Sequence, residues 1–348
     1  MECLVVGNGI AGCVLTHQLR KRNKNVHMIA KAAPKSSQYA AGILNPTVLK
    51  RYTAVWKAHE FHTTAIPFYE NLQKTLAVPM WHALPIHRIF STPAEQNAWM
   101  VAAGQKGLQD FLVPQLGTTS PATALHAPFG YGLVQQVGRL EVPSLVAATI
   151  AALGQNYTNA NFDYAQVQWV DDKPHYKGIT YDYIFFCEGY NAHHNPFFDL
   201  SALIGNKGEM LRIKSHHLPE DAIWKGPLFI CPLGAQKFWI GASFDPKNKE
   251  ASPSEEGKSW LLRQLAKMTS APFEILSHNS GIRPTTKDRR PLLGTHTTLK
   301  RLHLLNGLGT RGVLMAPLLS EWLCDAIFKN SPLPSEVDWQ RFAHLDSN

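Results

Sequence analysis

The stretch Cys3-Leu4-Val5-Val6-Gly7-Asn8-Gly9-Ile10-Ala11-Gly12 decides the fold expected for this chain. Its apolar start is typical of a buried parallel strand, and a Gly-x-Gly-x-x-Gly turn follows without a gap. In such a turn the first glycine permits the tight bend, the second lets a pyrophosphate approach the backbone, and the third lets a helix pack on the strand. That helix points its free N–H groups at the phosphates. The six residues from Gly7 to Gly12 therefore predict a Rossmann-type βαβ unit that binds a dinucleotide.

The end of the second predicted strand departs from the usual dinucleotide pattern. Residues 26–29 run into Ala30-Lys31, whereas an acidic residue that holds the ribose hydroxyls is expected there, about 20 residues after the glycines. Lys31 is a candidate cofactor contact, and it would suit the ribose phosphate of NADP. Ala30 leaves open how the ribose is held. We nevertheless expect FAD, because of the segments described below.

Composition limits the class of protein. The chain has 348 residues, 45% of them hydrophobic and 17% charged, which fits one or two domains with a large core. It contains no apolar run of about 18 residues and no signal-peptide pattern, so we expect a cytoplasmic protein without a membrane span. The five cysteines are scattered and lack a Cys-x-x-Cys pair, which predicts buried apolar residues in a reducing compartment and no metal site. The net charge of +8 is dispersed, so a nucleic-acid partner is possible but not favoured.

Segments of two different amino-acid compositions alternate along the chain. Residues 1–80, 136–204 and 281–348 carry glycine-punctuated strand patterns, and we expect them to form an α/β, Rossmann-like FAD-binding domain. Residues 81–135 and 205–280 are rich in Trp, His, Phe and Pro, with β-like runs at 228–231 and 237–241. These two pieces predict a smaller domain with an antiparallel sheet and helices, and a ligand cleft at the junction. Apolar residues at helical spacing predict a packed helix over 312–328.

Several segments resemble one family in its order. Residues 36–46 resemble the small-residue loop of the D-amino-acid oxidase and glycine oxidase (DadA-like) superfamily of FAD-dependent oxidoreductases. That loop runs beside the pyrophosphate and flavin, which implies cofactor contacts from Ala41, Gly42 and Leu44. Residues 138–143 look like the family's signal before a helix, here 144–153. The resemblance also places Val167, in the strand expected after that helix, at the adenine.

The later matches carry the resemblance to the flavin. Residues 183–190 are similar to the family's late strand over the cofactor, which implies contacts from Cys187, Glu188 and Gly189. Residues 281–294 and then 306–312 form the most specific match. The first of these implies that Arg283 binds the carboxylate of the substrate beside the cofactor. The second implies a glycine-rich turn at the flavin, made of Gly307, Leu308, Gly309, Thr310, Arg311 and Gly312.

The chemistry of these residues fits the implied roles. A guanidinium pairs with a carboxylate through two parallel hydrogen bonds and stays charged at any working pH. A helix beginning near Gly312 points its dipole at the part of the flavin where negative charge gathers on reduction. The alternative for Arg283 is a structural ion pair with Asp288. Phe229 stands where the glycine oxidase branch has a tyrosine near the substrate.

The resemblance implies an FAD-dependent enzyme that oxidises the C–N bond of a small amine or amino acid by hydride transfer to flavin N5. Arg283 would hold the carboxylate of the substrate, and no histidine is assigned as a base or a metal ligand. One alternative is a flavoprotein of the same superfamily that modifies a tRNA wobble base by trimming a carboxymethylamino group. The other is a non-catalytic flavin-binding protein, which the absent acid at Ala30 keeps open.

Overall fold

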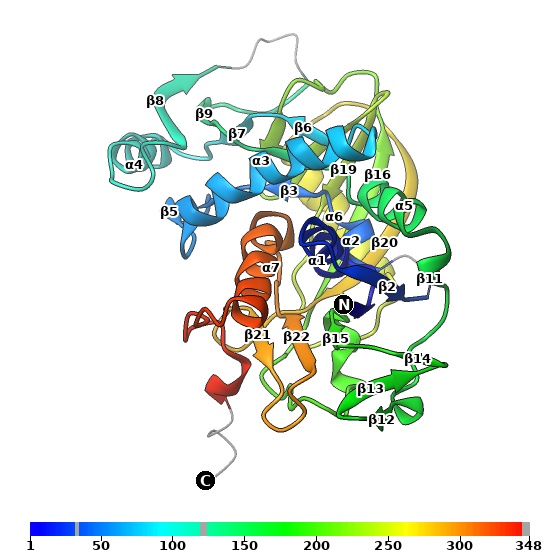
Figure 1. Ribbon diagram of the computed structural model, residues 1–348. Coiled ribbons are helices and arrows are strands. Elements are labelled where there is room, and N and C mark those ends of the chain that lie inside the picture. Colours follow the sequence, from blue (N-terminus) through cyan, green and yellow to red (C-terminus); the bar gives the residue numbers. More distant parts are fainter. Residues whose placement is uncertain (32–34, 119–123, 343–348) are drawn as a thin grey trace.

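The computed structural model describes residues 1–31, 35–118 and 124–342, which build two large β-sheets (Figure 1). The first sheet has the strand order β11-β2-β1-β15-β22-β21, and all its neighbours are parallel except β21, which pairs antiparallel with β22 at the edge. Its strands are β1 (Glu2–Val6), β2 (Asn25–Ile29), β11 (Tyr157–Thr158), β15 (Tyr183–Phe186), β21 (Leu292–Thr295) and β22 (Leu302–Asn306). The predicted Rossmann-like α/β class is confirmed.

Both faces of this sheet are covered, as its apolar strands require. Side chains alternate along β1, so Cys3 and Val5 join the core under the helices, whereas Leu4 and Val6 join a second core on the opposite face. On the helical face α1 packs against α5 and α7. The helices are α1 (Ile10–Lys21), α2 (Ser36–Tyr39), α3 (Ala58–Leu76), α4 (Pro93–Ala103), α5 (Val142–Leu153), α6 (Glu255–Leu265) and α7 (Gly312–Phe328).

The second sheet is larger and mainly antiparallel. Its order is β20-β16-β19-β18-β17-β7-β9-β8, with one parallel pair between β17 and β7. Its strands are β7 (Ile86–Ile89), β8 (Leu112–Gly117), β9 (Tyr131–Val134), β16 (Asn206–Lys214), β17 (Ile223–Lys225), β18 (Phe229–Gly234), β19 (Lys237–Gly241) and β20 (Glu274–Arg283). Helix α6 packs on one face through Leu261 and Leu265. Met210, Trp239 and Cys231 lie in the core on the other face.

Three small sheets complete the structure. They are β3 (Ile43–Leu44) with β10 (Gly138–Leu140) and β6 (Trp81–Ala83), β12 (Gln168–Val170) with β13 (Lys173–Tyr176) and β14 (Ile179–Thr180), and β4 (Thr47–Val48) with β5 (Thr53–Ala54). Every strand of the eight-stranded sheet lies between residues 86 and 134 or between 206 and 283. This distribution supports the proposed discontinuous domains, whose boundaries stay a prediction.

Individual elements differ from expectation in two places. Helix α5 begins at Val142 rather than at residue 144, because Pro143 is compatible with the first turn of a helix. The expected position of Val167 in the strand after α5 is wrong. That strand, β11, ends at Thr158, and Val167 instead follows a 3₁₀ turn whose start is capped by the Asp163 carboxylate. Helix α7 has the predicted bounds.

Cysteines, membrane-spanning helices and metal-binding groups are three features on which the described residues give information. All five cysteines are free and buried, as expected for small apolar residues. In residues 1–31, 35–118 and 124–342, no helix combines the length and the apolar character needed to cross a membrane. The same residues contain no group of three or more His, Cys, Asp or Glu side chains placed to hold a metal ion.

Candidate cofactor and substrate site

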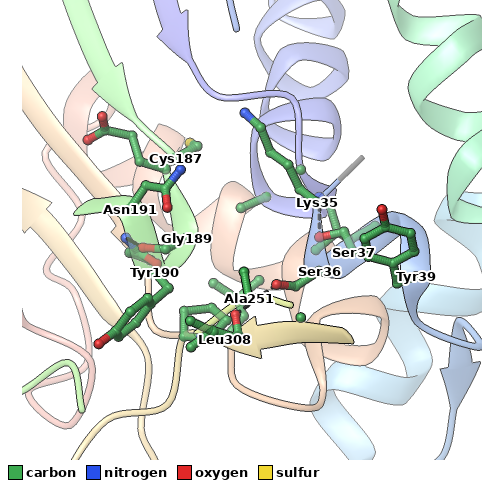
Figure 2. Close-up of a pocket in the computed structure, with 18 of the residues that line it drawn as sticks. Lys35, Ser36, Ser37, Tyr39, Cys187, Gly189, Tyr190, Asn191, Ala251 and Leu308 are labelled. Carbon is green, nitrogen blue, oxygen red and sulfur yellow. Dashed lines mark hydrogen bonds between the residues drawn. The ribbon is translucent and has the colours of Figure 1, made fainter. Parts of the chain in front are cut away.

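Two adjoining cavities lie where the first turn of α1 meets the eight-stranded sheet. Their volumes are about 370 and 400 Å³. Six residues line both of them, namely Ile10, Ser36, Ser37, Gly281, Pro284 and Leu308. In the first cavity, Lys35, Ser36 and Ser37 lie on one side, and residues 187–191, at the end of β15, lie on the other (Figure 2). Because they share these six residues, the two cavities form one continuous space, which extends from the end of β15 in the first sheet to the eight-stranded sheet.

The glycines of the first turn have different surroundings. A Cβ atom on Gly12 would overlap the backbone oxygen of Gly7, and one on Gly7 would overlap that of Cys187, so both glycines are needed for packing. Gly9 instead faces the first cavity, where the nearest atom to an added Cβ would be Ser37 Oγ at 3.3 Å. Gly9 is the N-cap of α1, no acid lies in the first turn, and the Ile10 N–H donates to Ser37 Oγ at 3.3 Å. This end of α1 fits a pyrophosphate.

Charged groups enter the first cavity from two sides. Glu188, just after β15, accepts hydrogen bonds from the Tyr164 hydroxyl and from Asn195 Nδ2, the latter at 2.8 Å. Burial raises the pKa of Glu188, against the lowering effect of these hydrogen bonds. Burial lowers the pKa of Lys35, and the charge of Glu188 opposes that shift. An acid thus lines the cavity at the end of β15, although none follows β2.

Arg283 lies in the second cavity, at the end of β20. Its Nη1 donates to Asn206 Oδ1 at 2.9 Å and to the Lys207 oxygen at 3.2 Å, and its Nη2 donates to the Ser243 oxygen at 3.2 Å. The guanidinium occupies the space beside Gly208 that a Cβ atom would fill. Burial lowers the pKa of Arg283 to about 10, so the side chain stays cationic at neutral pH.

The alternative ion pair between Arg283 and Asp288 is wrong. Asp288 instead forms an ion pair with Arg341, whose Nε and Nη2 donate to Asp288 Oδ2 at 2.9 Å and to Asp288 Oδ1 at 3.1 Å. No carboxylate in the described part of the chain forms an ion pair with Arg283, whose partners are amide and carbonyl oxygens. A partly buried cation of this kind, on a cavity wall, is suited to receive a carboxylate from a ligand.

The other walls of the second cavity are mainly apolar. Met210, Phe229 and Trp239 line it from the eight-stranded sheet, Phe244 lines it from the segment after β19, and Ala41 and Gly42 line it from the loop after α2. Trp239 Nε1 donates to the Tyr39 oxygen at 2.8 Å, which ties α2 to β19. Lys225 is the second cationic side chain on this wall. Apolar walls with few polar groups are typical of sites for small molecules and cofactors.

The glycine-rich turn before α7 closes the other side of this cavity. Leu308, Gly309, Thr310 and Gly312 line it. Arg311 lies behind the turn, where it donates to the Asn45 oxygen at 2.7 Å and the Thr47 oxygen at 3.2 Å. A Cβ atom on Gly312 would lie 2.8 Å from Ile10, so the first turns of α1 and α7 are direct neighbours. Two helix N-termini therefore face the joined cavities.

The predicted site residues divide into two sets. Those that line a cavity are Gly9, Ile10, Ala11, Ala41, Gly42, Cys187, Glu188, Gly189, Arg283, Leu308, Gly309, Thr310 and Gly312. Those that do not are Gly7, Asn8, Gly12, Lys31, Leu44, Val167, Gly307 and Arg311. Sequence reasoning assigned no contact with a ligand to Lys35, Ser36, Ser37 or Lys225. The two serines stand inside the segment that carried the resemblance, so their hydroxyl groups were a usable signal, whereas nothing local marks Lys225.

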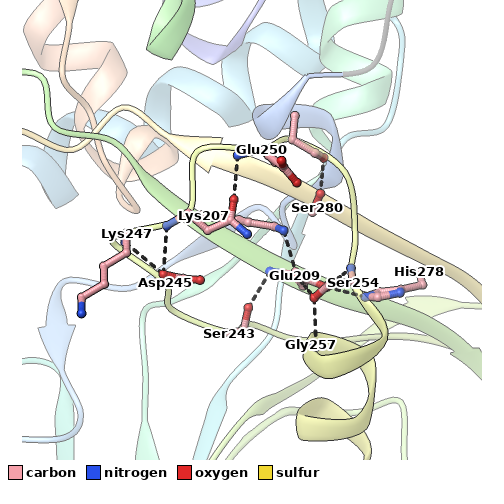
Figure 3. A network of polar contacts seen from close by, with 12 residues as sticks. Lys207, Glu209, Ser243, Asp245, Lys247, Glu250, Ser254, Gly257, His278 and Ser280 are labelled. Atoms are coloured by element: carbon pink, nitrogen blue, oxygen red, sulfur yellow. Dashed lines mark hydrogen bonds and ion pairs between the residues drawn. The ribbon is translucent and has the colours of Figure 1, made fainter.

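A buried polar network holds the segment between β19 and α6 against the first cavity (Figure 3). Glu209 lies 3.1 Å from Lys207 Nζ and 2.8 Å from His278 Nε2, and it accepts hydrogen bonds from Ser254 N and Oγ at 2.9 and 2.8 Å. Burial alone would raise the pKa of Glu209, but the hydrogen bonds from Ser254 and Lys207 lower it. Farther along, Ser280 donates to the oxygen of Ala251, which lines the first cavity.

Comparison with known families agrees with this geometry. A family model described as FAD dependent oxidoreductase, DAO, matches residues 2–326. The chain belongs to the DAO family of FAD-dependent oxidoreductases. FAD is thus its cofactor. The open side of Gly9, the start of α1 without a nearby acid and the apolar second cavity fit a dinucleotide with a flat ring.

Two kinds of protein are among the relatives of this DAO-family chain. A tRNA 5-methylaminomethyl-2-thiouridine biosynthesis bifunctional protein, MnmC, from Marinobacter nauticus is 22% identical over 353 residues, which cover 93% of this chain and 55% of that protein. Glycine oxidase from Bacillus subtilis is 24% identical over 149 residues, 42% of this chain and 40% of that one. The matched residues thus span about half the length, or less, of the curated relatives named here. The crystal structure of glycine oxidase from Bacillus cereus has the same fold, with a TM-score of 0.78, 18% identity and coverage of 95% and 96% of the two chains.

Proposed function

We propose that this DAO-family protein oxidises the C–N bond of an amine or amino acid that carries a carboxylate next to the reacting carbon. The observation that carries the proposal is Arg283, a partly buried guanidinium without a carboxylate partner in the described chain, on the wall of an apolar cavity. That cavity adjoins the space at the start of α1 through six shared residues. A family model for oxidoreductases over residues 2–326 favours an enzyme over a non-catalytic flavin-binding protein.

The residues of this chain would supply orientation and exclude water. In the proposed oxidation, the C–H bond beside the neutral amine breaks with its electron pair and the nitrogen lone pair forms a C=N bond. Water then hydrolyses the imine to a carbonyl compound and a free amine. FAD, when bound, supplies the two-electron acceptor. Arg283 would fix the carboxylate, and the apolar walls around Met210, Phe229 and Trp239 would keep the reacting carbon away from water.

A second candidate is the oxidation of an amine on a modified tRNA base. Its support is the alignment of MnmC proteins over 93%, 96% and 97% of this chain, together with a net charge of +8. Under this alternative, Arg283 would still bind a carboxylate, now on the modified base. The two candidates differ in substrate size and in the need for phosphate contacts.

The experiment is a substrate panel read by anaerobic bleaching of the flavin, with free amino acids, N-alkylated glycines and unmodified or modified tRNA. Arg283→Ala should lower kcat/KM on a carboxylate substrate. The loss should correspond to about 2–5 kcal/mol of transition-state stabilisation, the range for truncating one side of a buried charge pair. Arg283→Lys should restore only part, because a point charge does not reproduce the planar fork. Asp288→Ala is the matched control, since Asp288 pairs with Arg341. Unchanged turnover in Arg283→Ala would refute the proposal, and bleaching by tRNA alone would select the second candidate.

A further inference from the structure

Lys225 lies on the same wall of the second cavity as Arg283, but at its far side. Across the eight-stranded sheet, Lys225 pairs with Phe229, Phe229 with Gly241, and Gly241 with Met210. Directly paired residues point to one face of a sheet, and all four line the cavity. Strand β16, which carries Met210, also carries Gly208, over which the Arg283 guanidinium lies. The two cations therefore stand at opposite ends of one row of strands.

The separation of the two cationic groups follows from the sheet. Three strand spacings of about 4.8 Å separate β17 from β16, which is roughly 14 Å. The Lys225 amine reaches inward along this row, because its Nζ lies 4.7 Å from the centre of the Phe229 ring. About two spacings, roughly 10 Å, then remain between the amine and the guanidinium above Gly208.

The ammonium group of Lys225 is only partly satisfied by the protein. Its Nζ donates to the Gly226 oxygen at 2.7 Å and to the Pro227 oxygen at 3.3 Å, and an ammonium has three N–H donors. Within the described residues no carboxylate forms an ion pair with it. The charges that act on it belong to Arg88 and Lys50, both cationic, and Arg88 is already paired with Glu95 at 3.0 Å. Among the described residues, one N–H donor of Lys225 is thus left without a hydrogen-bond acceptor, and the Phe229 ring is the group that its charge contacts on the wall of the cavity.

We infer that Lys225 is a second anion-binding group of the substrate cavity, and that the substrate is an amine or amino acid with a further anionic group at the end opposite to its α-carboxylate. The inference rests on the proposed function only in taking Arg283 as the site of the α-carboxylate. An anion at Lys225 receives the third N–H and offsets the field of Arg88 and Lys50. A flexible linker of several carbons lets two carboxylates reach both cations, whereas malonate, with one carbon between them, is too short.

The test uses the FAD-loaded protein and carboxylates that lack an amine, so that binding is read without turnover. Adipate and hexanoate have the same number of carbons and differ only in the second carboxylate. Perturbation of the flavin absorbance gives a Kd for each, together with malonate. We expect adipate to bind at least about tenfold more tightly than hexanoate and than malonate, an effect of about 1.4 kcal/mol. Lys225→Met should reduce adipate to the affinity of hexanoate and leave hexanoate unchanged, and Lys225→Arg should preserve the preference.

Controls separate this role from a structural one. Lys50→Met removes an exposed cation that acts on Lys225 but does not line the cavity, and it should leave the preference within about twofold. Equal affinity of the wild-type protein for adipate and hexanoate would overturn the inference. So would a Lys225→Met variant that weakens both ligands equally, because Lys225 would then only support the backbone at 226–227. If instead Arg283→Ala leaves hexanoate binding unchanged while adipate stays preferred, the proposed function fails and the role of Lys225 stands.

Discussion

The guanidinium of Arg283 rests against Gly208, in the space that a side chain at residue 208 would occupy. Gly208→Ala should therefore displace the guanidinium without unfolding the protein, since the overlapping atoms are the end of a flexible side chain. A displacement of about 1 Å at a positioning group costs up to about a hundredfold in rate. We expect kcat/KM on a carboxylate substrate to fall by about ten- to a hundredfold, with flavin content and Tm close to wild type.

The double variant Gly208→Ala/Arg283→Ala is the control for this effect. If Gly208 acts only through Arg283, the double variant should lose no more activity than Arg283→Ala alone. Additive losses would show that residue 208 has an independent role.

Two glycines of the first turn should respond differently to the same substitution. Gly9 has an extended backbone with φ of −72°, and among the described residues the only neighbour of an added Cβ is Ser37 Oγ, so Gly9→Val should fold but lose FAD. Gly7 has φ of +109°, and its Cβ would overlap the Cys187 backbone, so Gly7→Val should lower Tm and the yield of folded protein. Flavin per mole of soluble protein and thermal melting distinguish the two outcomes. Normal FAD loading of Gly9→Val would contradict the assignment of this turn to the pyrophosphate.

Acid should destabilise the protein through His303. This side chain is buried beside Phe185, and its Nδ1 forms a hydrogen bond with the Thr295 hydroxyl at 3.0 Å. Burial lowers the pKa of His303 to about 3. The unfolded chain takes up a proton below its ordinary pKa of about 6.5, whereas the folded protein does so only near 3. The contribution of neutral His303 is therefore complete above about pH 6.5 and is lost towards pH 3, at about 1.4 kcal/mol per pH unit.

Urea unfolding between about pH 6 and pH 4 measures this effect. His303→Gln should reduce the slope of the unfolding free energy against pH by about 1.4 kcal/mol per pH unit, which corresponds to the uptake of about one proton fewer on unfolding. The exposed His216→Gln is the matched control and should keep the wild-type slope. Equal slopes in all three proteins would show that His303 does not titrate as described.

The preference for adipate should disappear in alkali. Burial, followed by the cations Arg88 and Lys50, lowers the pKa of Lys225 to about 8, whereas that of Arg283 is about 10. As pH rises through about 8, Lys225 becomes neutral while Arg283 stays charged, so adipate affinity should fall and hexanoate affinity should hold. Titrations between about pH 7 and pH 9 measure this. Lys225→Arg should abolish the pH dependence, and a preference for adipate that is constant with pH would contradict the assignment.

Local chemistry explains which features the sequence could predict. The strand, turn and helix over residues 2–21 follow from a short apolar run and three glycines, which form a recognisable local pattern. The bounds of α7 follow equally from a glycine start and apolar residues at helical spacing. The role of Arg283 in the substrate site came from resemblance rather than from local pattern.

Features that depend on distant pairing could not be predicted. The partner of Asp288 is Arg341, 53 residues later, and no local pattern separates it from the nearer Arg283. The row from Lys225 to Met210 depends on three strand registers, and a shift of one residue in any of them would turn side chains to the other face. Val167 was misplaced because β11 has only two residues, too few for a period to be recognised.

The interleaving of the two sheets determines when FAD can bind while the protein is being made. The glycine turn is synthesised first, but its neighbours in the site are residues 280–284 and 306–313, and the start of α7 lies directly beside Ile10. The ribosome must therefore have translated most of the described chain before the nucleotide is enclosed. Until then α1 lacks its partner α7 and leaves an apolar face uncovered, so the cofactor cannot protect this face of the nascent chain.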